Sequence, residues 1–186
     1  MNSESEIPRA SGALIAKERK VLEELVGNGT VRLALAKLPP EIRDEYEAIT
    51  PLTKIPTDTV ERVYEAVAEQ AGRDVFRMHR DVVRMGVEQA LKSIWRVLLR
   101  FTGDEALVRR TPLFFNRGLS KGKLEAKMVG AGKAEIRLTG WARVSELQIN
   151  GIAAAIEAVL TCAGRKTVRV ESHRTLDGAC LIATWG

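Results

Sequence analysis

Two histidines and two cysteines are the side chains of this chain that are best suited to acid–base, nucleophilic or metal chemistry. His79 falls within a helical pattern and His173 near the end of a predicted strand, and we expect ordinary surface or hydrogen-bonded roles for both. Cys162 and Cys180 match no paired metal-ligand spacing, so we interpret both as free thiols. These residues therefore predict no catalytic site, no metal and no cofactor.

Several aromatic side chains are the best candidates for a ligand site. Pockets for small molecules are mostly apolar and aromatic, although such side chains also build ordinary cores. The sequence therefore leaves two interpretations open, a core cluster or a pocket for a small hydrophobic effector. The residues concerned are Trp95, Phe101, Phe114, Phe115 and Trp141.

Basic residues gather in one segment of the chain. The net charge is +5, from 29 basic and 24 acidic residues, and residues 109–137 hold eight basic residues against two acidic ones. Such a stretch is usually a solvated face, but it is also typical of a surface that binds an acidic partner, anionic lipid head groups or nucleic acid. Because the excess charge is local, we do not expect a dedicated nucleic-acid-binding protein. The candidate residues for an anionic partner are Arg109, Arg110, Arg117, Lys121 and Lys123.

The elements that must position these residues are helical in the first half of the chain. Apolar residues recur at helical spacing, and Ser11 and Gly27 mark the first start and stop. A weak alternation over 31–38 fits either a strand or a short helix. Residues 1–10 are expected to be a flexible tail. Pro112 is expected to end a short helix. The predicted helices cover 11–26, 40–49, 59–71, 74–101 and 104–110.

The second half changes its period from 3.6 to 2 after Gly122. It predicts a hairpin with its turn at 130–132, a helix over 146–163 capped by Ser145, and a hairpin with its turn at Asp177-Gly178. The fold class is therefore α+β, with a helical N-terminal half packed on a four-stranded antiparallel sheet from a C-terminal β-β-α-β-β segment. We expect a single domain over 11–186.

The sequence carries no apolar run of about 20 residues that could span a bilayer. Its first eight residues are acidic and polar, where a secretory signal would be basic and then apolar. We therefore expect a cytoplasmic protein.

Four short segments resemble a known family. They are Leu38 to Tyr46 (LPPEIRDEY), Thr50 to Pro56 (TPLTKIP), Trp95 to Arg100 (WRVLLR) and Gly122 to Ala126 (GKLEA). Together they resemble an uncharacterised bacterial paralogous family related to 4-vinyl-reductase-type domains and, more distantly, to subunits of the TRAPP tethering complex and to the haem nitric-oxide-binding domain. This resemblance implies a sensory or protein-interaction module, dimeric through its N-terminal helices, rather than one fixed chemistry.

The chain departs from the motifs of these relatives. The haem-binding relatives use a proximal histidine with Tyr-x-Ser-x-Arg, and that motif is absent here, while only Cys180 remains of the zinc pattern in the last hairpin. The sequence thus favours a non-catalytic sensory or adaptor domain with a protein partner or a second copy of itself, and with a small hydrophobic effector as its ligand. The alternatives are binding of nucleic acid or an anionic surface through 109–137, and an enzyme for a small hydrophobic substrate that uses Cys180 or His173.

Overall fold

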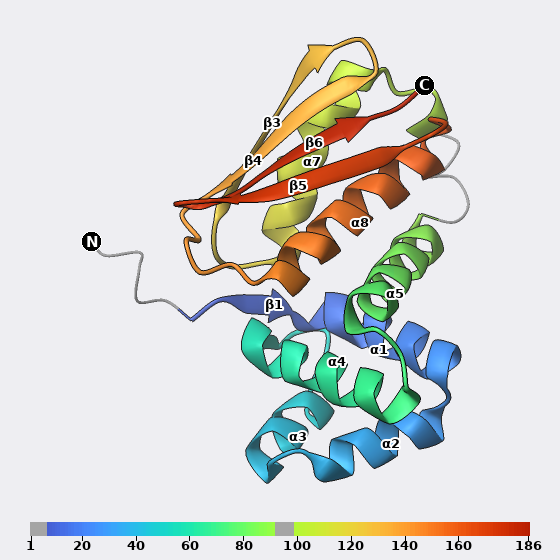
Figure 1. The fold of residues 1–186 in the computed structure, drawn as a ribbon, viewed down its shortest axis with the longest axis vertical. Coiled ribbons are helices and arrows are strands. Elements are labelled where there is room, and N and C mark those ends of the chain that lie inside the picture. Colours follow the sequence, from blue (N-terminus) through green and yellow to red (C-terminus); the bar gives the residue numbers. More distant parts are fainter. Residues whose placement is uncertain (1–6, 92–98) are drawn as a thin grey trace.

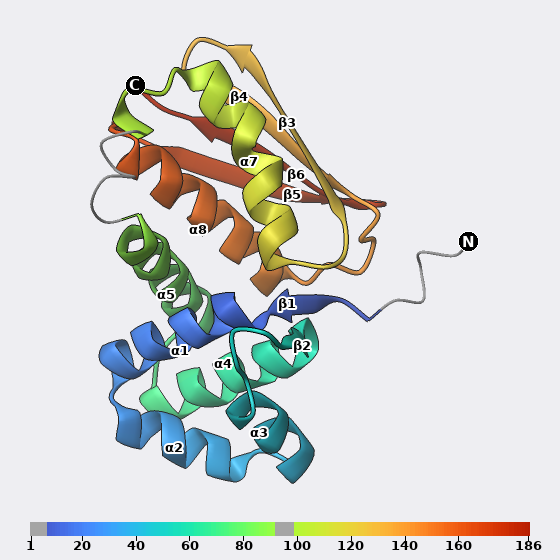
Figure 2. The ribbon, with the colours of Figure 1, turned by 180° about the vertical axis from the view of Figure 1, so that it is seen from behind.

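The computed structural model describes residues 7–91 and 99–186, which form a helical half and a sheet half placed end to end (Figure 1). Five helices that precede residue 92 build the helical half. In the sheet half, two helices cover one face of an antiparallel sheet, and the other face is open to solvent (Figure 2). The α+β class and the order of its parts are as the sequence predicts.

The first helix begins and ends at the residues that the sequence predicts. The side chain of Ser11 accepts a hydrogen bond from the backbone nitrogen of Leu14 at 3.3 Å and caps the first helix. Gly27 ends that helix with φ +87°, a backbone conformation that favours glycine. The bounds are α1 Gly12–Val26, α2 Asn28–Lys37, α3 Pro40–Glu47, α4 Thr57–Ala71 and α5 Val75–Ala90.

A short pair of strands joins the N-terminal segment to the rest of the fold. Strand β1 (Arg9–Ser11) pairs antiparallel with β2 (Lys54–Pro56), and Ala10 also bridges to Leu119. The prediction of a flexible tail over 1–10 is therefore wrong for residues 9 and 10, because Ala10 is buried between these partners. Residues 1–6 lie outside the described residues.

The sheet has the strand order β3-β4-β6-β5, and every neighbouring pair is antiparallel. Helices α7 and α8 lie side by side against its inner face (Figure 2). The predicted hairpins and the helix capped by Ser145 are all present. The bounds are α7 Asp104–Gly118, β3 Lys123–Gly130, β4 Lys133–Thr139, α8 Glu146–Cys162, β5 Arg169–Thr175 and β6 Gly178–Thr184.

Each half has its own hydrophobic core, and α8 contributes to both. Ile149, Ala153, Ile156 and Leu160 of α8 pack into the core under the sheet, whereas Leu147 belongs to the core of the helical half. A helix that is apolar on most sides must be covered on most sides. Helix α8 is therefore the element against which both halves are assembled.

Helix boundaries are where the structure departs from the sequence-based predictions. Residues 28–37 form a helix, which is one of the two alternatives that the weak alternation over 31–38 left open. Helix α5 ends at Ala90, residues 99 and 100 are helical again, and the part of the predicted 74–101 helix over 92–98 lies outside the described residues. Pro112 lies inside α7 and does not end it. Proline removes one helical hydrogen bond, but α7 continues because Leu107, Val108 and Phe115 are buried in the sheet core on both sides of Pro112.

Across the described ranges, 7–91 and 99–186, no helix is both long and apolar enough to cross a bilayer.

The cap of α8 gives a test of this arrangement. Ser145 accepts a hydrogen bond from the backbone of Gln148 at 3.0 Å and donates one to Glu61 of α4 at 2.6 Å, so it both starts α8 and ties it to the helical half. We expect Ser145→Ala to lower the free energy of unfolding by about 1–2 kcal/mol. Ser11→Ala removes only the cap of α1, so it should lower the free energy of unfolding by less. Urea unfolding of both variants measures the difference, and equal losses would contradict the role given to Ser145.

Candidate functional site

The predicted aromatic ligand residues do not gather at one place in the described chain. Phe115 and Trp141 are buried in the sheet core. Phe101 is 87% exposed and Phe114 is 47% exposed, so both face solvent. Trp95 lies outside the described residues. A pocket lined by this set stays a prediction, and its described members are divided between the core and the surface.

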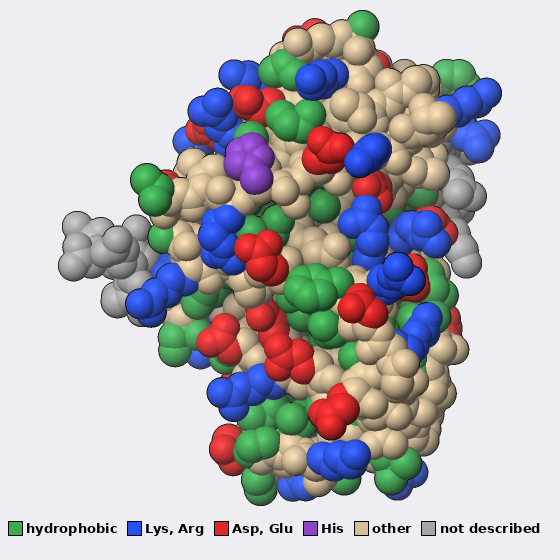
Figure 3. Space-filling model, in the orientation of Figure 1, with side chains coloured by type: hydrophobic (Ala, Val, Ile, Leu, Met, Phe, Trp, Pro, Cys, Tyr) green, Lys and Arg blue, Asp and Glu red, His purple; other side chains and the backbone are tan. Residues whose placement is uncertain are grey.

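The predicted cationic residues are divided among helix α7, the sheet and the connection between them, which holds Lys121. Arg109, Arg110 and Arg117 are exposed on α7 and form no ion pair with another described residue. Lys123 pairs with Glu125 on β3, with 2.6 Å between Nζ and Oε1. On the open face of the sheet, basic and acidic side chains are interspersed (Figure 3). The cations of β3 and β4 are therefore largely compensated, whereas those of α7 are not.

A buried polar cluster, which we call the junction cluster, consists of Glu18 of α1, Tyr64 of α4 and His79 of α5. The hydroxyl of Tyr64 donates a hydrogen bond to Glu18 Oε2 at 3.1 Å. The rings of Tyr64 and His79 pack edge to face, with 4.6 Å between their centroids. Glu18 is only 7% exposed and His79 only 5%. Polar side chains at this depth are unusual unless they are paired. The cluster therefore distinguishes the junction, where the helical half meets the sheet half, from the apolar cores.

Burial disfavours the charged forms of the side chains in the junction cluster. It raises the pKa of Glu18 to about 7, and the hydrogen bond from Tyr64 lowers that pKa only in part. It lowers the pKa of His79 to about 4, although a hydrogen bond with the backbone of Leu147 opposes the shift. At neutral pH the imidazole is therefore uncharged. Its Nδ1 is buried and has no hydrogen-bond partner in the described chain.

Helix α8 passes very close to the imidazole of His79. A Cβ added to Gly151 of α8 would lie 2.6 Å from Cε1 of His79, which is closer than any ordinary contact. Only glycine lets α8 come this near to α5. The His79 ring is thus enclosed between Gly151 on one side and Tyr64 on another.

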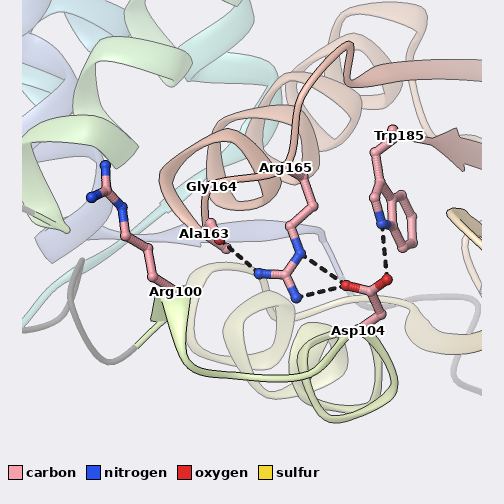
Figure 4. Close-up of a pocket in the computed structure, with 7 residues that line it drawn as sticks. Arg100, Asp104, Ala163, Gly164, Arg165 and Trp185 are labelled. Atoms are coloured by element: carbon pink, nitrogen blue, oxygen red, sulfur yellow. Dashed lines mark hydrogen bonds and ion pairs between the residues drawn. The ribbon is translucent and has the colours of Figure 1, made fainter.

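A surface hollow, which we call the end hollow, lies where α7 begins and α8 ends (Figure 4). Its volume is about 570 Å³. The side chains of Arg100 and Trp185 stand on opposite sides of it, and its remaining lining comes from Asp104 and the turn after α8. The described residues that line it are Arg100, Asp104, Ala163, Gly164, Arg165, Trp185 and Gly186.

A hydrogen-bonded network fixes one side of the end hollow. Arg165 donates from Nε and Nη2 to Asp104 Oδ1, at 2.8 and 2.6 Å, and also to the backbone carbonyls of Thr102 and Ala163. The indole nitrogen of Trp185 donates to the other Asp104 oxygen at 3.1 Å. Burial opposes ionisation of Asp104, but the bonds from Arg165 and Trp185 outweigh it and lower the pKa. The guanidinium of Arg165 therefore uses its hydrogen bonds within the protein and is not available to a ligand.

Arg100 is the cation of the end hollow that remains available to a ligand. Its side chain points away from the Arg165–Asp104 pair, and it forms no ion pair with another described residue (Figure 4). The stem of Arg100 lies over Gly164. The hollow can thus offer an aromatic indole and a guanidinium to one small molecule, a combination suited to an apolar body with an acidic group.

Cys180 and His173 lie opposite each other on β6 and β5, which the sequence alone could not show. Both belong to the open face of the sheet, and Arg137 of β4 is the other neighbour of Cys180. Burial raises the pKa of the Cys180 thiol, so the nucleophilic thiolate is disfavoured. Within the described ranges, no group of three or more His, Cys, Asp or Glu side chains could hold a metal ion.

Solved structures identify the fold. The Cs H-NOX mutant with 4-cyano-L-phenylalanine gives a TM-score of 0.69 at 19% identity, over 94% of this chain and 96% of that one. A point mutant of T. tengcongensis H-NOX gives 0.67 at 21% identity, over 94% and 97%. An oxygen-binding H-NOX domain related to soluble guanylate cyclases gives 0.65 at 18% identity, over 94% of each chain. The fold is that of an H-NOX domain.

The resemblance to haem nitric-oxide-binding domains is thus confirmed for the fold. A scan of protein-family models and a search of curated proteins found no match to this chain. The resemblances to the bacterial paralogous family, to 4-vinyl-reductase-type domains and to TRAPP subunits stay predictions.

The H-NOX fold raises the question whether the described residues fit haem. Haem iron needs an axial ligand, most often a histidine, that faces a large apolar slot. His79 faces Gly151 and Tyr64 at contact distance, and it lines neither the end hollow nor a second hollow beside α1. His173 is exposed on the open face of the sheet. Neither histidine is therefore placed to hold a haem iron.

Sequence reasoning missed both the junction cluster and the end hollow. Glu18 could have been noticed, because it falls on the apolar stripe of α1 between Ile15 and Val21. Tyr64 lies on the buried side of α4 together with Val60, Val63 and Val67. The end hollow has no signal in the sequence, since Asp104, Arg165 and Trp185 come from three distant segments.

The contact between Gly151 and His79 can be tested by adding one methyl group. Alanine is a better helix former than glycine by about 1 kcal/mol, so Gly86→Ala in α5, where a Cβ meets nothing within 4 Å, should stabilise the protein. We expect Gly151→Ala to destabilise it instead, by about 1–3 kcal/mol, because the His79 ring must move. The loss should shrink in a His79→Ala background. Gly151→Ala as stable as Gly86→Ala in thermal unfolding would contradict the contact.

The junction cluster predicts how stability depends on pH. The pKa of Glu18 is raised on folding, so the folded state loses stability as pH rises from 4.5 to about 7, by about 3 kcal/mol in total. The pKa of His79 is lowered, so stability is lost as pH falls from 6.5 to about 4. Between pH 4.5 and 6.5 the two effects oppose each other.

Substitution of either residue should reveal the pH dependence of the unfolding free energy that the other residue causes. Relative to the native protein, Glu18→Gln should gain stability as pH rises through this range, and His79→Gln should gain stability as pH falls. Chemical unfolding at several pH values measures both. Glu47→Gln, at an exposed position of α3, is the control and should show no such trend. Parallel pH profiles for all three variants would exclude the buried pair as the source.

Proposed function

We propose that this chain is a non-catalytic sensory domain that binds a small hydrophobic effector and passes the binding on to a protein partner. The observation that carries the proposal is the H-NOX fold, which extends over 94% of the chain. A solved neighbour is an oxygen-binding domain related to soluble guanylate cyclases. Ligand binding without turnover is the function that this likeness favours.

The residues of the chain support a sensor rather than an enzyme. Cys180 and His173 are neighbours, but burial disfavours the thiolate of Cys180, and His173 lies on the open face of the sheet. Neither residue lines the end hollow. A nucleophile or base that stands apart from the hollow cannot act on a ligand held there.

The effector is expected to bind in the end hollow and not as haem. Trp185 offers one face of an indole, and Arg100 offers a cation without an ion pair in the described chain. An apolar or aromatic molecule with one carboxylate or similar group would use both. The described aromatic residues that the sequence suggested for an effector site do not line the end hollow, and Trp185 supplies the indole there.

Signalling requires that the ligand favour one of two states of the domain. The end hollow lies at the C-terminal end of α8 and the junction cluster near its N-terminal end. Helix α8 therefore connects the proposed ligand site with the contact between the two halves. A partner protein, or a second copy of this chain, would respond to a change in that contact.

Binding of a small apolar anion tests the proposed site. We expect anilinonaphthalene sulfonate to bind the native protein at one site, with energy transfer from tryptophan to the dye. Arg100→Gln should weaken binding at least about fivefold, because one charge-assisted contact is lost. Trp185→Phe should reduce the energy transfer, whereas Trp141→Phe should not.

Arg143→Gln is the matched control for charge, since Arg143 is exposed in a turn away from the end hollow. It should bind the dye as the native protein does. Unchanged dye affinity in Arg100→Gln, or unchanged energy transfer in Trp185→Phe, would remove the end hollow as the ligand site.

A further inference from the structure

Helix α7 has an exposed face that is both basic and apolar. Arg110, Leu113, Phe114 and Arg117 recur at the spacing of one side of a helix, with Arg109 next to them. Leu113 is 61% exposed and Phe114 is 47% exposed. We call these five residues the α7 face. Large apolar side chains gathered on one exposed stripe mark an interaction site more often than single ones do.

The charge of the α7 face has one sign. Both acidic residues of α7, Asp104 and Glu105, lie in its first turn, and no acidic residue follows before its end at Gly118. Its three arginines form no ion pair with another described residue. This contrasts with the open face of the sheet, where glutamates lie beside the cations.

The α7 face lies on the outside of the molecule. Helix α7 packs on β3 through its buried side and stands in front of the sheet when the molecule is seen from behind (Figure 2). The apolar surface continues beyond the helix, because the partly exposed Leu14 of α1 would lie 3.3 Å from a Cβ added to Gly118. The face is the convex side of a helix and not a groove.

We propose that the α7 face docks on an anionic lipid bilayer. Basic side chains beside an apolar stripe match the two layers of such a surface, with phosphates outside and acyl chains beneath. The helix would lie in the plane of the membrane, Leu113 and Phe114 would enter the boundary between head groups and acyl chains, and the arginines would meet the phosphates. This surface is separate from the end hollow, so it does not rest on the proposed ligand.

Two other anionic partners fit the α7 face less well. Nucleic acid would contact the arginines, but its phosphate backbone offers nothing to Leu113 and Phe114, which occupy the centre of the face. An acidic protein would need a groove that accepts a convex helix. A bilayer needs only to be flat and negatively charged.

Sedimentation with vesicles tests the proposal. We expect the protein to bind vesicles of phosphatidylcholine with about one-third phosphatidylglycerol at least about tenfold more tightly than vesicles of phosphatidylcholine alone. Raised salt should weaken the binding. Arg110→Glu with Arg117→Glu, and separately Leu113→Ser with Phe114→Ser, should each lower the affinity at least about tenfold. The fluorescence of Phe114→Trp should shift to the blue on the anionic vesicles.

A matched control lies on α2. Arg32 and Leu33 are both exposed there, so Arg32→Glu with Leu33→Ser changes the same residue types and should bind like the native protein. Circular dichroism shows that each variant is folded. Equal binding to both kinds of vesicle, or unchanged binding by the α7 variants, would overturn the proposal. Binding of duplex DNA or polyglutamate without binding of vesicles would also overturn it and assign the face to an acidic macromolecule.

Discussion

The close contact between α5 and α8 is the constraint on which the rest of the structure depends. Helix α8 is covered by the sheet on one side and by α5 on the other, and Gly151 lets the two helices approach until His79 fills the space between them. Polar contacts flank this point, since Arg80 of α5 pairs with Glu157, and Asn150 donates a hydrogen bond to the carbonyl of Phe76 at 3.0 Å. This helix pair is therefore the main contact between the two halves, beside the Ser145–Glu61 hydrogen bond and the bridge between Ala10 and Leu119.

This contact explains why polar groups are buried at the junction. Burial disfavours the charged forms of Glu18, Tyr64 and His79, because the helices exclude water and packing has removed most of the exposure of each side chain. The same α8 ends at the Ala163–Arg165 turn, which Asp104 ties to the start of α7. A ligand beside that turn would act on the helix that carries the junction. Buried polar contacts of this kind are weak sources of stability and well suited to an element with two arrangements.

Much of the fold could be predicted from the sequence, because local rules decided it. Ser11 and Ser145 cap the helices they were expected to cap, and the alternation after Gly122 produced both hairpins. The errors arose where packing overrode local preference. Pro112 stays inside a helix because the residues around it are anchored in the core. The sites were harder, since Glu18, Tyr64 and His79 meet only in three dimensions, as do Asp104, Arg165 and Trp185.

The fold and the site also carry different information about function. The structure has the H-NOX fold, yet its two histidines are enclosed against Gly151 or exposed on the sheet, so neither faces a slot for a porphyrin. Neither histidine of this H-NOX fold is therefore placed to hold a haem iron. The most direct test is the visible absorption spectrum of the protein after production with added haemin and removal of unbound haem by gel filtration. The enclosed His79 predicts no Soret band, while an oxygen-binding H-NOX domain carried through in parallel keeps one. A Soret band at one haem per chain, lost in His79→Ala, would contradict this conclusion.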